Sequence, residues 1–182
     1  MADSIGTSTG RSRSVHGLFR DRDSAERFYG SLSSRGYGKD DVNLLMSDDT
    51  RKKYFAGDKD GGDTDLGDKA WEDAGKGAAI GAGTGATIAA IAAIGTTLMI
   101  PGLNLLVAGP IAAALAGAGA GGLTGGLIGA LVGRGVPKEH AEHYDKGIRE
   151  GGILVGVDAR SDEDAEYFEN EFRTHRGEHV YR

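Results

Sequence analysis

The chain of 182 residues contains no cysteine, three prolines and a single tryptophan. Without cysteine there can be no disulfide bond, no zinc site with thiolate ligands and no thiol nucleophile. Basic residues number 21 against 27 acidic ones, a net charge of −6, and this balance argues against nucleic acid as a partner. The first residues also lack the apolar run of a secretory signal peptide, so we expect 1–14 to be a disordered tail.

Charge is missing altogether from one long stretch, which begins after Lys76 and ends before Arg134. The stretch is rich in glycine and alanine, and its small residues recur every four positions, a spacing that puts them on one helix face. Such a face lets two helix backbones approach closely, so the pattern predicts a glycine zipper that serves helix packing and oligomerisation. Its glycines are Gly77, Gly81 and Gly85 in a first series, and Gly109, Gly117, Gly121, Gly125, Gly129 and Gly133 in a second.

The glycine-rich stretch, 76–134, is interrupted at its centre by Pro101, Gly102 and Pro110, which predict the turn of a hairpin. Two helices are expected, 77–100 and 110–133, each roughly 36 Å long and therefore able to cross a hydrocarbon core of about 30 Å. Basic residues near both ends would keep those ends on the cytoplasmic side of a membrane. The connecting residues are themselves apolar, which leaves open a re-entrant hairpin or one buried against partner subunits.

The residues before the glycine-rich stretch predict a first βαβ half over 15–46, followed by an acidic, glycine-rich and aspartate-rich linker over 47–75. The helix of this half is expected from residue 24 to residue 35, between strands at 15–19 and 42–46. Its apolar residues recur at i, i+3, i+4 and i+7, which is typical of a helix with one buried face. They are Ala25, Phe28, Tyr29 and Leu32.

The residues after the stretch, 135–182, predict a helix followed by a second βαβ half. The last helix begins with a good N-cap, Ser161, and has three acidic residues in its first turn, where the helix dipole favours negative charge. The expected elements are a helix at 138–150, a strand at 153–157, a helix at 161–174 and a short strand at 179–181.

The two halves resemble each other, because residues 23–28 and 163–168 have similar sequences and each follows a strand. Two βαβ halves in one antiparallel sheet predict an α+β fold, a ferredoxin-like domain split by the inserted helical hairpin. The strands at 15–19 and 153–157 are expected at its centre. Both halves must then lie on the same side of any membrane, which agrees with a hairpin of two spans.

Several short motifs for ligands or catalysis are incomplete. Residues 58–63 resemble part of a calcium loop but lack its glycine and glutamate in register. The GxGxxG at 117–122 follows a helical run and not a strand. Two histidine pairs, His140 with His143 and His175 with His179, lack a third metal ligand, and no GxSxG motif is present. We therefore expect no catalytic residue, no metal, no cofactor and no small-molecule ligand, and predict that the chain is not an enzyme.

Three segments carry a resemblance to a known family. The run at 42–55, the hairpin centre beginning at Ile100 and the segment 142–152 resemble motifs of a bacterial family of heat- or cold-induced general stress proteins. The resemblance extends over 15–182 apart from the aspartate-rich linker, which is longer and more acidic than in that family. It implies a role in stress and no defined reaction.

These observations predict a stress-associated, non-enzymatic protein that forms a homo-oligomer through its glycine zipper. In the leading interpretation the hairpin lies in the lipid bilayer of the bacterial cytoplasmic membrane, and the sheet domain is a cytoplasmic interaction module. In the alternative, the protein is a soluble assembly such as a ring, shell or filament, with the hairpins buried between subunits. A third hypothesis, a sensor whose sheet domain binds a small ligand, has no identifiable pocket residues.

Overall fold

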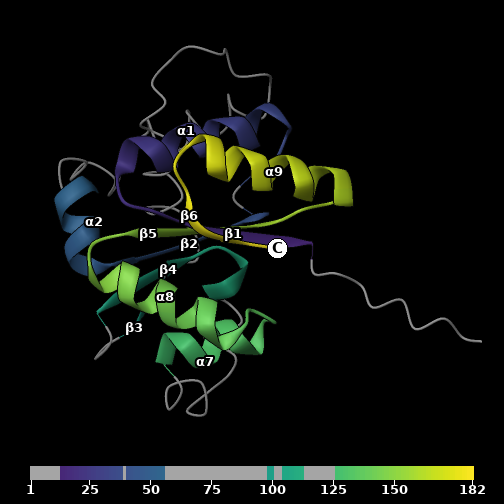
Figure 1. Ribbon diagram of the computed structural model, residues 1–182. Coiled ribbons are helices and arrows are strands. Elements are labelled where there is room, and N and C mark those ends of the chain that lie inside the picture. Colours follow the sequence, from purple (N-terminus) through teal and green to yellow (C-terminus); the bar gives the residue numbers. More distant parts are fainter. Residues whose placement is uncertain (1–12, 39, 56–97, 101–103, 113–125) are drawn as a thin grey trace, which may run out of the picture.

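The structure is a computed structural model, and it is an α+β fold built on one antiparallel sheet of six strands in the order β3-β4-β2-β5-β1-β6 (Figure 1). It describes residues 13–38, 40–55, 98–100, 104–112 and 126–182. The strands are β1 (Ser14–Phe19), β2 (Val42–Ser47), β3 (Leu98–Ile100), β4 (Leu105–Ala108), β5 (Ile153–Asp158) and β6 (Glu178–Tyr181).

Helices cover both faces of the sheet (Figure 1). One face carries α1 (Arg22–Ser34) and α9 (Asp162–Thr174), and the other carries α7 (Gly126–Gly133) and α8 (Lys138–Arg149). A fifth helix, α2 (Asp48–Phe55), follows β2 at one end of the sheet. None of the helices in the described part of the chain is both long and apolar enough to cross a membrane.

The centre of the sheet agrees in part with the sequence prediction, because β5 is a central strand, between β2 and β1, whereas β1 lies next to the edge strand β6. Strands β1 and β5 are adjacent and antiparallel, with Val15 opposite Val157, and β5 also pairs with β2. Strands β1 and β2 are both antiparallel to β5 and therefore parallel to each other, as a βαβ crossover through α1 requires. The predicted N-cap of α9 is present, because Ser161 accepts a hydrogen bond from the Asp164 amide at 3.0 Å. The structure adds a cap that the sequence analysis did not name: Asp21 precedes α1 and accepts a hydrogen bond from the Ser24 amide at 2.8 Å.

Between the sheet and the helices α1 and α9 lies the aromatic core, which is formed by alternate residues of the strands. The ring centroids of Phe28 and Phe172 are 3.8 Å apart, and Phe19 lies 5.5 Å from Phe172. Gly17 of β1 permits this packing, because a Cβ atom there would lie 2.5 Å from the Phe172 ring. Large aromatic side chains therefore pack against one another and against the aliphatic strand residues of this face.

The opposite face of the sheet packs against α7 and α8 and forms the insert-side core, which is aliphatic apart from Tyr144. Its strand residues are those between the strand residues of the aromatic core, because successive side chains along a strand point to opposite faces of the sheet. The sheet contributes Leu18, Leu45, Leu105, Val107 and Leu154, and the helices contribute Leu127, Leu131, Ala141, Tyr144 and Ile148.

The prediction of a continuous helical hairpin over 76–134 is wrong at its centre. Residues 98–100, expected in the first helix, form β3, and the expected connection contains β4, which pairs with the edge of β2. The reason is that Leu105 to Val107 bury large side chains on both faces of the sheet, which a turn could not do. The apolar character of this connection, unusual for a loop, is explained by its place in the sheet.

The predicted zipper positions have different fates. Gly109 is not in a helix but in a turn with φ of +94°, where a Cβ atom would lie 2.1 Å from the Val42 carbonyl oxygen. Pro110 begins a helical segment, 110–112, and Gly129 and Gly133 belong to α7, which is helical as predicted. The remaining positions lie outside the described residues: Gly77, Gly81, Gly85, Pro101, Gly102, Gly117, Gly121 and Gly125.

The start of the predicted linker, 47–75, is not a simple linker but forms a helix, because α2 occupies Asp48–Phe55. Ser47 acts as its cap and accepts a hydrogen bond from the Thr50 amide at 3.1 Å. Asp48 lies in the first turn and pairs with Lys52 at 2.6 Å, and these interactions hold the pKa of the Asp48 carboxyl below its usual value. A cap, early acids and late bases are helix signals that outweigh the polar composition.

Candidate functional site

The site begins with α7, whose two sides differ. Leu127 and Leu131 are buried against the sheet and α8. A Cβ atom at Gly129 or Gly133 would in contrast have no described atom within 4 Å apart from its chain neighbours and the backbone of its own helix. Val132 is 43% exposed on the same helix. The small residues therefore lie away from the domain, and the large leucines fix the helix to it.

Beneath the ends of the insert a row of four residues crosses the sheet on the side of α7 and α8. The strand register places Tyr181 of β6 opposite His16 of β1, His16 opposite Gly156 of β5, and Gly156 opposite Asn43 of β2. We call these four residues the polar row. Two of its members are almost fully buried: His16 is 4% exposed and Asn43 is 1% exposed. Buried polar groups carry a cost unless they are bonded, so their partners matter.

Asn43 connects the sheet to the insert. Its side-chain oxygen accepts a hydrogen bond of 2.7 Å from the backbone amide of Ile111, in the helical segment that starts at Pro110. An amide near the start of a helix has no partner within the helix, so Asn43 supplies the missing acceptor. This bond fixes the insert immediately after the close contact of Gly109 with β2.

Asp158 lies beside the polar row at the end of β5 and collects contacts from three elements. The Ser14 hydroxyl donates to its Oδ1 at 2.5 Å. The Asn43 side-chain amide and the Arg134 guanidinium each approach Oδ2 at 3.4 Å. Arg134 directly follows α7, so its ion pair holds the C-terminal end of that helix near the sheet.

His16 is the titratable member of the row. Its ring lies directly over Gly156, where a Cβ atom would be 2.6 Å from the imidazole Nδ1. Burial lowers the pKa of His16 to about 4, an effect that the Asp158 carboxylate opposes and the Arg134 cation reinforces. At neutral pH the imidazole is therefore uncharged within the fold.

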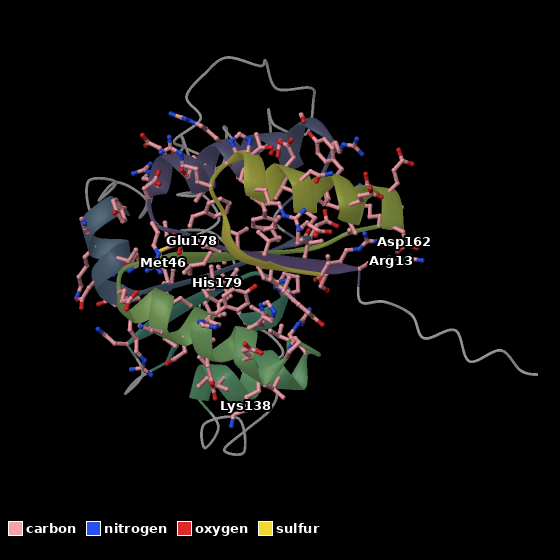
Figure 2. The ribbon with its side chains drawn as sticks, in the orientation of Figure 1. Arg13, Met46, Lys138, Asp162, Glu178 and His179 are labelled. Carbon is pink, nitrogen blue, oxygen red and sulfur yellow. The ribbon has the colours of Figure 1, made fainter. Side chains whose placement is uncertain are left out.

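A second group of histidines lies at the β6 edge, and its pairing differs from the pairs considered in the sequence. His179 stacks on His143 of α8, with ring centroids 4.4 Å apart and planes 9° apart, and Figure 2 shows His179 between β6 and α8. His140 contacts Tyr181 instead, and His175 lies 3.3 Å from Glu171 on α9. Burial and the neighbouring His143 lower the pKa of His179. Among the described residues, no group of three histidine or carboxylate side chains is placed to hold a metal ion.

Comparison of the chain with protein-family models, with curated proteins and with solved structures finds no match. A function for this chain is therefore inferred from the geometry of the molecule and from the sequence resemblance described above.

Sequence reasoning missed the polar row. The sequence predicts His16 and Asn43 only as members of strands. For the two charged neighbours of the row, it predicts Arg134 only as a charge flanking the apolar stretch, and it ends the strand at 157, before Asp158. A signal exists, because a histidine and an asparagine interrupt apolar strands that are otherwise buried on both faces. Such residues require buried partners, although the partners themselves follow only from the register.

Proposed function

We propose that this chain is a non-enzymatic, self-associating protein in which the insert joins copies through its glycine faces. The observation that carries the proposal is the orientation of α7, whose leucines pack on its own domain while Gly129 and Gly133 meet no described atom. A helix face of hydrogens beside the exposed Val132 is suited to the close approach of another helix. The role in stress is supported by the family resemblance alone.

We further propose that the domain is ferredoxin-like and that the insert is an addition to it. The order β2-β5-β1-β6 and the two crossovers through α1 and α9 on one face support this assignment. Strands β3 and β4, with α7 and α8, then extend the sheet and cover its second face. The insert is in this view not an independent unit but is fixed to the domain at several points.

The attachment of the insert favours an assembly in which protein surrounds the hairpin. Ile111, at one end of the expected second span, is buried and bonded to Asn43, and Leu131, at the other end, is buried against the sheet side of α7. A span of 110–133 standing clear of the domain would have to give up both contacts.

A second candidate is insertion of the insert into the bacterial cytoplasmic membrane. The observation in its favour is that no charged residue occurs from 77 to 133, which removes the largest cost of burial in lipid. In this arrangement the glycine faces would serve the same self-association within the bilayer.

The proposal is tested by the double variant Gly129→Leu and Gly133→Leu, examined by size-exclusion chromatography with light scattering in detergent-free buffer. We expect the wild-type chain to be oligomeric and the variant to dissociate, because two leucines separate the helices. Gly30→Leu is the matched control, since Gly30 lies on α1, on the opposite face, and also meets no described atom within 4 Å. A monomeric wild type, or an oligomer unchanged by the double variant, would contradict the proposal.

Flotation with vesicles of anionic phospholipid distinguishes a protein assembly from insertion into a membrane. Protein that remains in the aqueous fraction as a defined particle supports the protein assembly, and protein that floats with the vesicles supports the membrane. The Gly129→Leu and Gly133→Leu variant should still float in the second case, because the leucines increase its apolar surface.

A further inference from the structure

The two carboxylate oxygens of Asp158 differ in their hydrogen bonds, because Oδ1 has a short one and Oδ2 has only long ones. Oδ1 receives the Ser14 hydroxyl at 2.5 Å, whereas Oδ2 has the Arg134 and Asn43 nitrogens at 3.4 Å. A distance of 3.4 Å is near the limit of a hydrogen bond, and charge-assisted bonds are usually about 2.7–2.9 Å. The Oδ2 atom can therefore accept a better donor.

His16 is such a donor once it carries a proton. It lies opposite Gly156, two residues before Asp158 on β5, and therefore diagonally across the strand pair from that carboxylate on the same face of the sheet. Diagonal neighbours in an antiparallel pair lie about 7–8 Å apart at Cα, within reach of long side chains. The imidazole and the guanidinium of Arg134 both act on one carboxylate, and as cations they repel each other.

The contact of Arg134 with Asp158 matters for α7 because the arginine follows the last residue of that helix. Around the same end, the Arg134 amide donates to the Leu131 carbonyl at 3.1 Å, and Val136 is buried. Both side chains of the ion pair are partly exposed, so the Arg134 cation can be exchanged for another donor.

We propose that protonated His16 replaces Arg134 as the partner of Asp158, so that acidification releases the C-terminal end of α7 from the sheet. The protonated imidazole of His16 then bonds the Asp158 carboxylate and becomes accessible to solvent, and Arg134 no longer has an ion-pair partner on the sheet. This inference does not depend on the proposed self-association, because it concerns only the docking of α7 on its own domain.

The other groups around His16 do not supply the switch. Tyr181 lies beside it on β6, and Tyr144 of α8 donates its hydroxyl to the His179 carbonyl at 2.6 Å. Burial raises the pKa of the Tyr144 hydroxyl, which therefore stays neutral. Three further histidines lie on this side of the described structure, the stacked pair His143 and His179 and also His140, whose ring is 4.8 Å from Tyr181 and which serves as the control.

The absence of cysteine allows the release to be measured directly in the full chain. Val132→Cys on α7 and Glu166→Cys on α9, both exposed, place spin labels on opposite sides of the sheet. Their distance is measured by pulsed electron spin resonance between pH 7.5 and 4.5, with the labelled chain diluted in unlabelled protein to remove distances between copies.

We expect a single distance at pH 7.5 and a longer population that grows with acid. If His16 recovers an ordinary pKa near 6.5 on release, the ratio of released to docked molecules rises about 70-fold by pH 4.5. His16→Gln should abolish this dependence, Asp158→Asn should lengthen the distance already at pH 7.5, and His140→Gln should behave as the wild type. A distance that does not change with pH, a change that persists in His16→Gln, or loss of far-ultraviolet ellipticity over the same pH range would each overturn the inference.

Discussion

The two faces of the sheet are both covered by helices, but their cores are built from different kinds of side chain. In the aromatic core Phe172 stacks on both Phe19 and Phe28, beneath two helices that belong to the βαβ units. The insert-side core combines aliphatic residues with a buried polar row, and one of its helices, α7, comes from the glycine-rich stretch. One face is built for stability, and the other also holds a segment in place.

The difference shows how a segment of low complexity can be attached to a folded domain. Leucines at 127 and 131 supply non-directional burial, whereas Asn43 and Asp158 bond particular atoms of the insert and so define its position. Apolar contact alone would allow α7 to slide, because burial is non-directional. The following predictions test this comparison, beginning with the largest expected effect.

The aromatic core should contribute most to stability. Phe172→Ala removes a fully buried ring that stacks on Phe28 at 3.8 Å, and we expect it to lower the free energy of unfolding by about 3–5 kcal/mol. Chemical denaturation with urea, followed by circular dichroism, measures the loss. Glu166→Ala, at an exposed position on the same helix as Phe172, is the control and should change stability by less than about 0.5 kcal/mol. A loss below about 1 kcal/mol for Phe172→Ala would show that the aromatic face is not the main core.

The helices and strands of the aromatic face were predictable from sequence because their signals are local. The periodicity of Ala25, Phe28, Tyr29 and Leu32 identifies α1, and the cap at Ser161 identifies the start of α9 within one residue. Each of these signals depends on residues within one or two turns of each other. The adjacency of β1 and β5 followed from the similarity of the two halves.

The insert-side face was less predictable because its signals are short or long-range. Four apolar residues at 105–108 can form a strand or part of a helix, and periodicity does not distinguish the two over so short a run. Because Pro101, Gly102 and Pro110 surround this run, the sequence predicted it as the connection of a helical hairpin. The free edge of β2, which decides the outcome, is a feature of the folded sheet and not of the run itself. The polar row is defined by register between strands about 140 residues apart in sequence, which no local pattern reveals.

The second prediction concerns the pH dependence that the polar row gives to its face. The pKa of His16 is about 4 in the folded chain and about 6.5 when unfolded, so between these values the unfolded state binds more protons. Stability is therefore complete above pH 6.5 and is lost as the pH falls toward 4, by on the order of 3 kcal/mol. Urea denaturation of the wild type and His16→Gln at pH 7.5 and 4.5 measures it. An equal loss in both proteins would assign the acid sensitivity to other groups.

The third prediction separates the two bonds of Asn43. Asn43→Ala leaves the buried Ile111 amide without its acceptor and should cost about 1–3 kcal/mol, with faster hydrogen exchange at residues 111 and 112. Asn43→Asp keeps an acceptor for that amide but places a second carboxylate near Asp158. If the amide bond is the important contact, exchange at 111 should remain slow in Asn43→Asp even where overall stability falls. Fast exchange in both variants would show that the side-chain amide of Asn43 is equally needed.

The smallest expected effects compare the two helices of the aromatic face with each other. Ser161→Ala removes one capping bond, to the Asp164 amide, and should cost about 1 kcal/mol. Asp21→Ala removes bonds to both the amide and the hydroxyl of Ser24, at 2.8 and 2.9 Å, so its cost should be the larger of the two. Because both helices pack on the aromatic core, neither variant should alter hydrogen exchange at residues 111 and 112, where Asn43→Ala acts. Thermal unfolding with exchange measured in parallel tests both statements, and a cap variant that loosens 111 and 112 would show that the two faces are coupled through the sheet and do not respond separately.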